Sequence, residues 1–429
     1  MSERAAEERA GPRPLPLHLM AAWLIWASSH AALPLARSGL LVWKDELAAE
    51  GRRLARALER EPVAELASAL GVAGARRLAA MLEGISAYRA HPYRRRLPEP
   101  PVPWREGSTR LLDYGGAERG APPIVFVPSL VNRGYILDLS ERRSLLRFLS
   151  ARGLRPLLLE WGAPEETERH FAFDDYIGGR LERALDWVAS AGRPIVLAGY
   201  CMGGLMALAA ALSRRDIAGL ALLATPWDFH AERAEDARRL GQMMAGLEAV
   251  LAPSHPVPVD LLQALFALLD PARVPAKFRA FAALDPASAE ALDFVALEDW
   301  ANDGIPLPLA VAREVFVGWY GENRPGRGLW RVAGRAVDPA RLAVPSFVVI
   351  PKNDRIVSPK GAAALARAIP GAKVLSAALG HVGMVASPRA PEAVWQPLAD
   401  WLLSLKAAVP AQARVRRRAR RPPATALRA

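Results

Sequence analysis

The residue best placed for covalent chemistry is Cys201, the one cysteine among 429 residues. It lies in the segment Gly199–Gly204 (GYCMGG), after the apolar run Ile195–Ala198 and before an alanine-rich stretch. A nucleophile between a strand and a helix is the pattern of a nucleophile elbow, here with cysteine in place of serine. Glycines two positions before and after it avoid clashes in so tight a turn. A small buried cysteine is the alternative, but this placement favours a nucleophile.

A cysteine nucleophile needs a base and a group that orients the base. In this type of site an acidic residue and then a histidine follow the nucleophile, each after a late strand. Asp354 follows the apolar run Ser346–Ile350, and His381 follows Val374–Ala377. The alternatives are a turn-capping aspartate and a structural loop histidine. The order and spacing favour a catalytic triad of Cys201, Asp354 and His381.

Acyl transfer at such a triad also requires backbone N–H groups that stabilise an oxyanion. The usual donors are the residue after the nucleophile and one in the loop after an earlier strand. These donors map to Met202 and to Leu130 in the loop Pro128–Asn132. No metal-binding or dinucleotide-binding motif can be identified, so we expect neither a metal nor a resident cofactor.

The elements that must position these residues alternate between short apolar runs and amphipathic helical stretches. This alternation predicts an α/β fold with a mostly parallel sheet and helices on both faces. The stretch from His230 to Arg327 breaks the pattern, because it is helical and punctuated by prolines, and it is predicted to be an inserted cap. The expected strands are Thr109–Tyr114, Ile124–Val127, Pro156–Glu160, Ile195–Ala198, Leu220–Ala224, Ser346–Ile350 and Val374–Ala377.

The same patterns divide the chain into five parts. Residues 1–104 form a helical N-terminal segment that ends in the proline-rich linker His91–Trp104. Residues 105–229 and 328–408 form the two parts of the α/β core, and residues 230–327 form the cap. Residues 409–429 form an Arg-rich tail without apolar periodicity, which we expect to be disordered.

The charge and cysteine content exclude several classes of protein. A single cysteine excludes an internal disulfide framework and fits a cytoplasmic protein. Seven of the net positive charges lie in the tail, so the rest of the chain is only mildly basic. The tail could bind a polyanion or an anionic surface, or simply keep the chain soluble. Motifs for sequence-specific nucleic-acid binding are missing.

A second apolar segment, Leu17–Leu33, lies near the N-terminus between Pro16 and Pro34. It is shorter than the roughly 20 residues that a membrane span needs, and acidic residues precede it. We therefore expect no transmembrane span and no signal peptide. The segment is either a helix packed on the body or an interfacial helix with Trp23 and Trp26 on a lipid or polymer surface.

Several motifs together resemble the polyhydroxyalkanoate synthase family, closest to the class III catalytic subunit. They cover about two thirds of the chain, and their order is more specific than any one of them. The motifs are PIVFVPSLVNRGYILDL at Pro123–Leu139, LLLEWG at Leu157–Gly162, DDYIGG at Asp174–Gly179, the Gly199–Gly204 box, TPWDF at Thr225–Phe229, LEDWANDG at Leu297–Gly304, WYGENRPGRG after it, NDRIV around Asp354 and GHVGMV around His381.

The resemblance implies an α/β-hydrolase fold and a cysteine-dependent acyltransferase that polymerises 3-hydroxyacyl-CoA and releases CoA. It implies catalytic roles for Cys201, Asp354 and His381, a polymer granule surface, and a homodimer or a second subunit as partners. Two departures, Arg355 directly after Asp354 and Leu205 after the paired glycines, bear on substrate range. A thioesterase or polyester depolymerase with the same triad stays open, as does a non-catalytic granule-associated protein.

Overall fold

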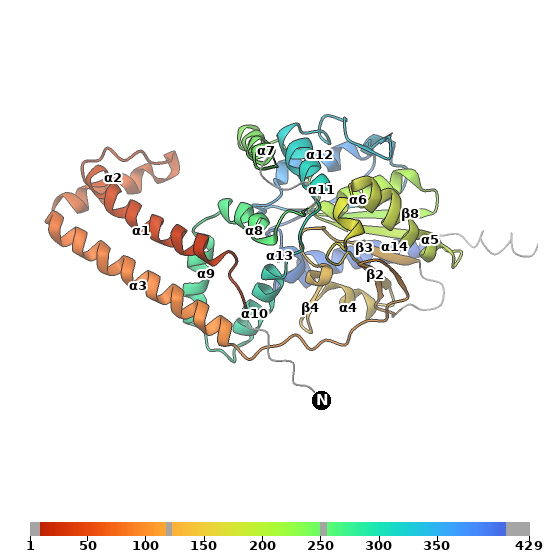
Figure 1. Ribbon diagram of the computed structural model, residues 1–429, viewed down its shortest axis with the longest axis horizontal. Coiled ribbons are helices and arrows are strands. Elements are labelled where there is room, and N and C mark those ends of the chain that lie inside the picture. The colour runs from red at the N-terminus through yellow and green to blue at the C-terminus, as the bar shows by residue number, and fades with distance from the viewer. Residues whose placement is uncertain (1–8, 117–121, 249–254, 409–429) are drawn as a thin grey trace, which may run out of the picture.

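The computed structural model describes residues 9–116, 122–248 and 255–408 of the chain. The expected Arg-rich tail, residues 409–429, lies outside the described residues. The rest forms a body built on one large sheet and an elongated helical arm that projects from it (Figure 1).

The central sheet has eight strands in the order β1-β2-β6-β3-β7-β8-β11-β12. All neighbouring pairs from β6 to β12 are parallel, whereas β2 pairs with β1 and β6 antiparallel. This agrees with the predicted mostly parallel sheet. The strands are β1 Trp104–Glu106, β2 Thr109–Asp113, β3 Pro123–Val127, β6 Arg155–Glu160, β7 Ile195–Tyr200, β8 Ile217–Leu223, β11 Ser346–Pro351 and β12 Lys373–Ala377.

Helices cover both faces of this sheet, which explains why its inner strands are apolar throughout. Every residue of β3, β7 and β11 is buried, because a parallel strand between two helical layers has no solvent-facing side. One face packs against α5 Glu182–Ala189, α6 Met202–Ser213 and α12 Pro359–Ala368. The other packs against α4 Leu145–Ser150, α13 Gly383–Ala386 and α14 Gln396–Ala408.

The long segment between β8 and β11 carries the helices predicted as a cap. The regular elements described within residues 230–327 are all helical. They are α7 Ala234–Glu248, α8 Val259–Leu268, α9 Arg273–Ala282, α10 Ala289–Asn302, α11 Leu309–Arg313 and the π-helix η5 Glu314–Gly321. Two short hairpins were not predicted from the sequence. They are β4 Asp138–Ser140 with β5 Arg143–Ser144, and β9 Arg331–Val332 with β10 Arg335–Ala336.

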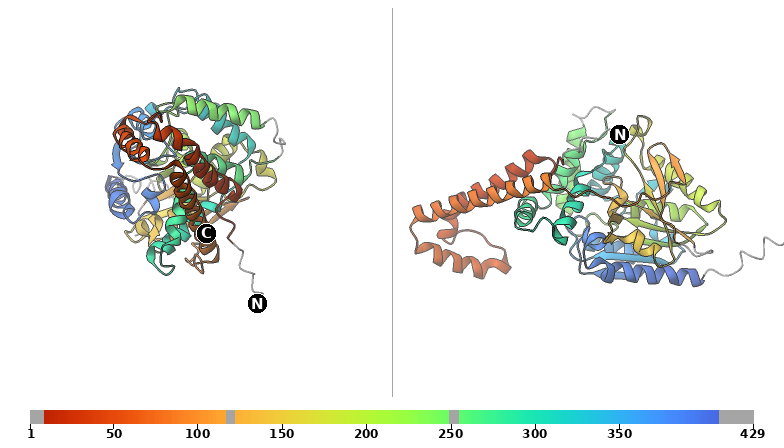
Figure 2. Two further views of the ribbon diagram at one scale, coloured as in Figure 1. Left: turned by 90° about the vertical axis from the view of Figure 1, so that its left-hand side faces the viewer. Right: turned by 90° about the horizontal axis from the view of Figure 1, so that it is seen from below.

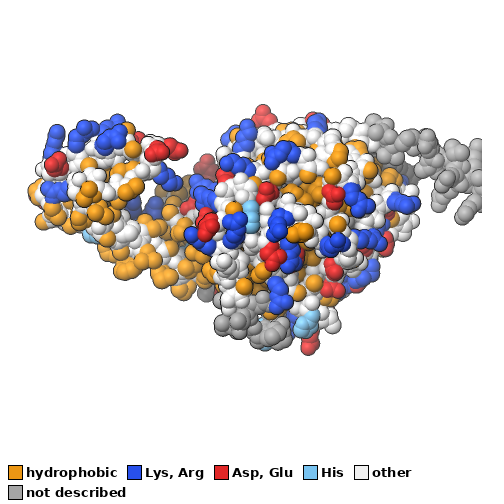
Figure 3. Space-filling model, turned by 90° about the horizontal axis from the view of Figure 1, so that it is seen from above, with side chains coloured by type: hydrophobic (Ala, Val, Ile, Leu, Met, Phe, Trp, Pro, Cys, Tyr) orange, Lys and Arg blue, Asp and Glu red, His pale blue; other side chains and the backbone are white. Residues whose placement is uncertain are grey.

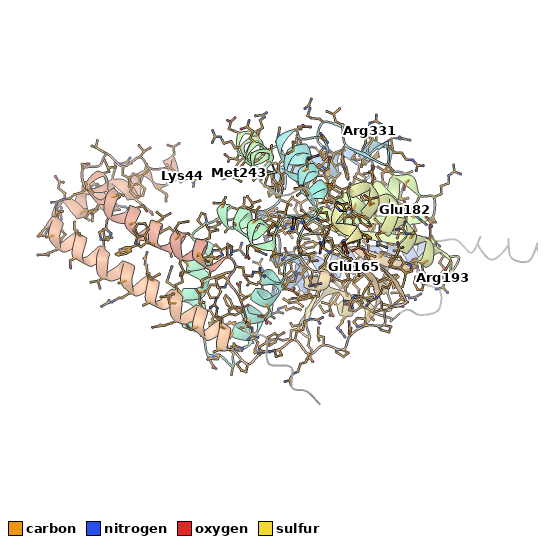
Figure 4. The ribbon with its side chains drawn as sticks, in the orientation of Figure 1. Lys44, Glu165, Glu182, Arg193, Met243 and Arg331 are labelled. Atoms are coloured by element: carbon orange, nitrogen blue, oxygen red, sulfur yellow. The ribbon has the colours of Figure 1, made fainter. Side chains whose placement is uncertain are left out.

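The arm consists of α1 Leu15–Arg37, α2 Ala48–Glu59 and α3 Val63–Ala90. Figure 2 shows that it extends away from the sheet and meets the body mainly where α3 crosses α9. At this junction Tyr88 packs edge-on against Phe278, and its hydroxyl donates to Asp299 of α10 at 2.9 Å. Farther out, Lys44 in the loop after α1 stands well away from the sheet (Figure 4).

The structure corrects the prediction for the apolar N-terminal segment. We expected a helix confined between Pro16 and Pro34, but α1 runs through both prolines and has 23 residues. Pro16 lies in the first turn, where a backbone N–H has no partner within the helix, and Pro34 lies in the last turn. The helix is thus long and apolar enough to cross a membrane, so the length argument against a span no longer holds.

Most of α1 faces solvent rather than the body. Only 6% of its apolar window is buried, and within α1 only His18 and Leu33 are buried residues. Trp23 is 52% exposed, and Figure 3 shows hydrophobic side chains gathered along the arm. Of the two alternatives for this segment, the exposure favours an interfacial helix over one packed on the body.

Candidate active site

Cys201 lies at the turn between β7 and α6, at the carboxyl end of a central strand. Its backbone has φ 55° and ψ −127°, a conformation that residues other than glycine rarely adopt. Hydrogen bonds hold it there, because its N–H donates to the Leu223 carbonyl at 2.9 Å and its carbonyl accepts from Gly204 at 3.0 Å. Strain stored in this way is typical of functional sites.

The glycines around Cys201 are required by space. A Cβ atom on Gly199 would lie 2.3 Å from the Gly204 Cα, and one on Gly203 would lie 2.0 Å from the Val127 carbonyl oxygen. A Cβ atom on Gly204 would lie 1.9 Å from the Thr225 hydroxyl. The turn therefore packs α6 directly onto the ends of the neighbouring strands, for the reason that the sequence pattern suggested.

Asp354 and His381 meet at the same edge of the sheet. Asp354 follows β11, His381 follows β12, and both side chains are buried. His381 Nδ1 donates to Asp354 Oδ2 at 2.6 Å. The other carboxylate oxygen accepts the backbone N–H groups of Ile356 at 2.8 Å and Val357 at 2.9 Å. Both oxygens are thus occupied, which fixes the carboxylate and with it the imidazole.

Cys201 completes the cluster on the other side of the histidine. Burial alone would lower the pKa of His381. The negative charge of Cys201, together with hydrogen bonds to Asp354 and Cys201, instead raises that pKa to about 10. Tyr200 supports the histidine through a hydrogen bond from its hydroxyl to the His381 carbonyl at 3.3 Å. The structure therefore brings the three predicted residues together, with their catalytic roles still a prediction.

The two expected oxyanion donors belong to the elbow itself and to the loop after the neighbouring strand β3. Met202 is the first residue of α6, and Leu130 follows β3, the strand next to β7. Ser129 Oγ accepts the N–H of Val131 at 3.2 Å, whereas no hydrogen bond from the Leu130 N–H is found within the described residues. The Leu130 N–H is therefore available to a ligand, and the assignment of both donors stays a prediction.

One aromatic residue of the cap that interacts electrostatically with the cluster, Tyr320, was missed by sequence reasoning. Burial raises the pKa of the Tyr320 hydroxyl, in η5, and the negative charges of Cys201 and Asp354 raise it further. Its ring lies 4.8 Å from that of Phe229. Its neighbour Trp319 stacks on Phe173 in the core. Tyr320 stands in the WYGENRPGRG motif, which was the available signal.

A cavity of about 350 Å³ opens beside the histidine. It is lined by Asn353, Arg355, Gly380, His381 and Arg273 of α9. It gives a small molecule access from solvent to the His381 side of the cluster. Among the described residues, no three His, Cys, Asp or Glu side chains come close enough together to hold a metal ion.

Comparisons with known proteins agree with this architecture. A family model described as the alpha/beta hydrolase fold matches residues 122–387. A poly(3-hydroxyalkanoate) polymerase subunit PhaC of Haloferax mediterranei is 29% identical over 70% of this chain and 63% of its own length. The corresponding subunit of Synechocystis is 28% identical over 65% of this chain and 77% of its own length. These relatives confirm the resemblance to polyhydroxyalkanoate synthases noted in the motifs.

Among solved structures, a monoacylglycerol lipase of Paleococcus ferrophilus is similar, at 17% identity over 69% of this chain and 99% of its own, with a TM-score of 0.42. The family model spans well over half of the chain and includes the elbow as well as the loops of Asp354 and His381. The chain belongs to the alpha/beta hydrolase fold family.

Proposed function

We propose that this protein is an acyltransferase that polymerises 3-hydroxyacyl-CoA into a polyhydroxyalkanoate through an acyl-cysteine. One observation carries the proposal: a lone cysteine at a strained strand–helix turn adjoins a buried His381–Asp354 pair. The names of its similar proteins, poly(3-hydroxyalkanoate) polymerase subunits, support the substrate class.

The first half-reaction forms the acyl-enzyme. The Cys201 thiolate attacks the thioester carbonyl, and the N–H groups of Met202 and Leu130 stabilise the oxyanion. The carbon–sulfur bond to CoA then breaks, and the His381 imidazolium gives its proton to the departing CoA thiolate. The raised pKa of His381 suits this step, because the ring carries that proton at neutral pH.

The second half-reaction extends the polymer. The 3-hydroxyl of one acyl group loses its proton to the neutral His381 as its oxygen attacks the thioester carbonyl of another acyl group. A carbon–oxygen ester bond forms, and the thiolate that leaves is held by the imidazolium. Asp354 either orients the histidine or helps to activate that hydroxyl. A thioester is a more activated acyl donor than an oxygen ester, so cysteine suits repeated transfer.

Exclusion of water from Cys201 favours transfer to a hydroxyl over hydrolysis. Cys201 is partly buried and packs against both core clusters, and Tyr320 and Phe229 pack against one of the same clusters. We therefore rank polymerisation above the thioesterase and depolymerase alternatives. The same triad would serve all three, and only the acceptor differs.

The arm and the cellular context form a further part of the proposal. The exposed apolar side chains of α1, including Trp23 and Ile25, would bind the surface of a polyester granule in the cytoplasm. A second copy of the chain or a second synthase subunit is the partner that the resemblance implies. Coenzyme A enters as part of the substrate, and the proposed chemistry needs no resident cofactor.

The decisive experiment incubates purified protein with 3-hydroxybutyryl-CoA, follows CoA release and identifies the product. Insoluble polyester supports polymerisation. Free 3-hydroxybutyrate as the sole product would replace the proposal with hydrolysis, and no CoA release across several acyl chain lengths would leave a binding role.

A further inference from the structure

The loop that follows β3, residues 128–134, carries the expected oxyanion donor Leu130 and is anchored to the sheet at both ends. At its start the Trp161 indole N–H donates to the Pro128 carbonyl at 3.0 Å. At its end the Gly134 N–H donates to Glu160 Oε2 at 3.0 Å. Both partners belong to the end of β6 or follow it directly, so the sheet fixes the two ends of this loop and leaves its middle to other contacts.

The middle of the loop is held by the cap. The end of α10 and the residues after it lie along loop residues 131–133, as a short antiparallel contact between Asn132 and Gly304 records. Ile305 N–H donates to the Val131 carbonyl at 2.9 Å. The remaining contacts are to Arg133, whose carbonyl accepts from the Trp300 indole at 2.8 Å and whose guanidinium pairs with Asp303 at 3.0 Å.

These contacts act on peptide groups that follow the donor in the same loop. The carbonyls of Val131 and Arg133 are both bound by the cap, and the N–H of Val131 is bound by Ser129. The Leu130 N–H therefore lies in a loop whose next peptide group is held by Ser129 and whose later peptide groups are held by cap residues. Stabilisation of an oxyanion falls steeply when a donor moves by a fraction of an ångström from its position.

We propose that Asp303 and Trp300 are positioning residues for acyl transfer, through which the cap aims the Leu130 N–H at the oxyanion. The proposal rests on the proposed acyl transfer at Cys201. Neither residue needs to touch the substrate, because each acts through Arg133. The rate of acylation therefore depends on the position of the cap. If the cap is displaced, the triad stays intact but the Leu130 N–H no longer completes the oxyanion hole.

The pair is suited to a test that separates positioning from stability. Arg133 and Asp303 are 33% and 43% exposed, and ion pairs at that exposure contribute little to the free energy of unfolding. Helix α10, which Asp303 directly follows, offers a matched control in Asp293. Asp293 pairs with Arg142 at 3.0 Å and with Arg143 at 2.7 Å, at the β4–β5 hairpin. Asp293 links α10 to the body without touching the loop.

The experiment compares Asp303→Asn with Asp293→Asn in the full-length protein. Acylation of Cys201 is measured in single turnovers with 3-hydroxybutyryl-CoA and with p-nitrophenyl butyrate, which needs no CoA recognition. Alkylation of Cys201 by iodoacetamide is measured in parallel, because this displacement develops no oxyanion. Trp300→Phe removes the indole donor to Arg133 together with part of a buried ring, and it serves as a second variant.

For Asp303→Asn we expect acylation to be about 10- to 100-fold slower. This decrease in rate is smaller than the one caused by removing an oxyanion donor altogether. KM should change less than about twofold, and alkylation should keep the wild-type rate. Trp300→Phe should slow acylation less, and Asp293→Asn should leave both reactions unchanged.

Two results would overturn the proposal. One is an acylation rate for Asp303→Asn equal to that of Asp293→Asn. The other is a parallel loss of acylation and alkylation, which would mean that the triad itself is disturbed. A wild-type protein that accepts p-nitrophenyl butyrate but no hydroxyacyl-CoA would refute the proposed function while the ester still tests the positioning. A wild-type protein inert to both substrates would refute both.

Discussion

The body and the arm of this protein treat apolar residues in opposite ways. In the body β7, which carries Cys201, and its neighbour β3 are fully buried, and the His381 and Asp354 side chains have partners within the chain. In the arm α1 leaves Trp23, Leu24 and Ile25 between 41% and 52% exposed. The apolar residues of the body are accounted for by burial in its core. The exposed apolar residues of the arm instead indicate contact with a surface outside the chain.

The body side of this contrast is tested most severely at Cys201. Cys201→Ala removes the nucleophile, so CoA release should fall about ten-thousandfold or more while the fold is kept. Cys201→Ser should retain weak hydrolysis at most, because serine is a poorer leaving group once acylated. CoA release measured with a thiol reagent checks both variants, and full activity of Cys201→Ala would disprove the site.

A pair of glycines compares packing in the two regions directly. Gly203→Ala should destabilise the protein by about 3 kcal/mol or more and abolish activity, because its Cβ would lie 2.0 Å from a carbonyl oxygen. Gly71→Ala in α3 has no atom closer than 4.0 Å and should stabilise by roughly 0.5–1 kcal/mol. Urea denaturation measures the change in the free energy of unfolding for both variants. Equal changes would contradict the difference in packing between the body and the arm.

The ionisation of His381 in the body makes both the stability of the fold and the rate of acylation depend on pH. The pKa of His381 is about 10 in the folded protein and about 6.5 unfolded, so protonated His381 stabilises the fold. This contribution is complete below about pH 6.5 and is lost as the pH rises towards 10. Acylation should fall only as the pH approaches 10, where the folded protein loses the imidazolium proton that the departing CoA needs.

The control for this pH effect is His381→Gln, which should flatten the loss of stability between pH 6.5 and 10. Thermal unfolding across that range gives the measurement. An unchanged slope in the variant would assign the pH dependence to other groups.

The smallest expected effect on stability lies in the arm. Trp23→Ala should shift Tm by about 1 °C or less, since its side chain is half exposed. The same change should weaken co-sedimentation with polyester particles severalfold, because a large interfacial aromatic group is lost. A large drop in Tm would show that Trp23 is covered in solution, for example by a second copy of the chain.

Local patterns in the sequence were enough to predict the core of the site. The elbow glycines, the apolar strands and the order of Asp354 and His381 each depend on a few neighbouring residues, and the structure brings these elements together. Tyr320 escaped prediction because its approach to Cys201 depends on how the cap folds over the sheet. The ion pair between Asp303 and Arg133 was not predictable for the same reason, because it joins residues 170 positions apart in the sequence.

The misjudged elements have local physical reasons. Pro16 and Pro34 were taken as helix boundaries, but α1 includes both. Pro16 lies in the first turn, where the missing N–H would have had no partner, whereas Pro34 gives up one helical hydrogen bond close to the end of α1. β1 begins at the last residue of the proline-rich linker, and an edge strand of three residues leaves almost no alternation to detect. The antiparallel pairing of β2 with β6 cannot be read from its own side-chain pattern.

The insertion of the cap between β8 and β11 also bears on synthesis of the chain. Cys201 is made early, together with the strand that carries it, whereas Asp354 and His381 belong to loops after the last two strands. A nascent chain that has completed β8 holds the nucleophile without its base or orienting carboxylate. We expect the ribosome-bound protein to be inactive, so that the proposed acyl transfer begins only after the C-terminal strands have joined the sheet.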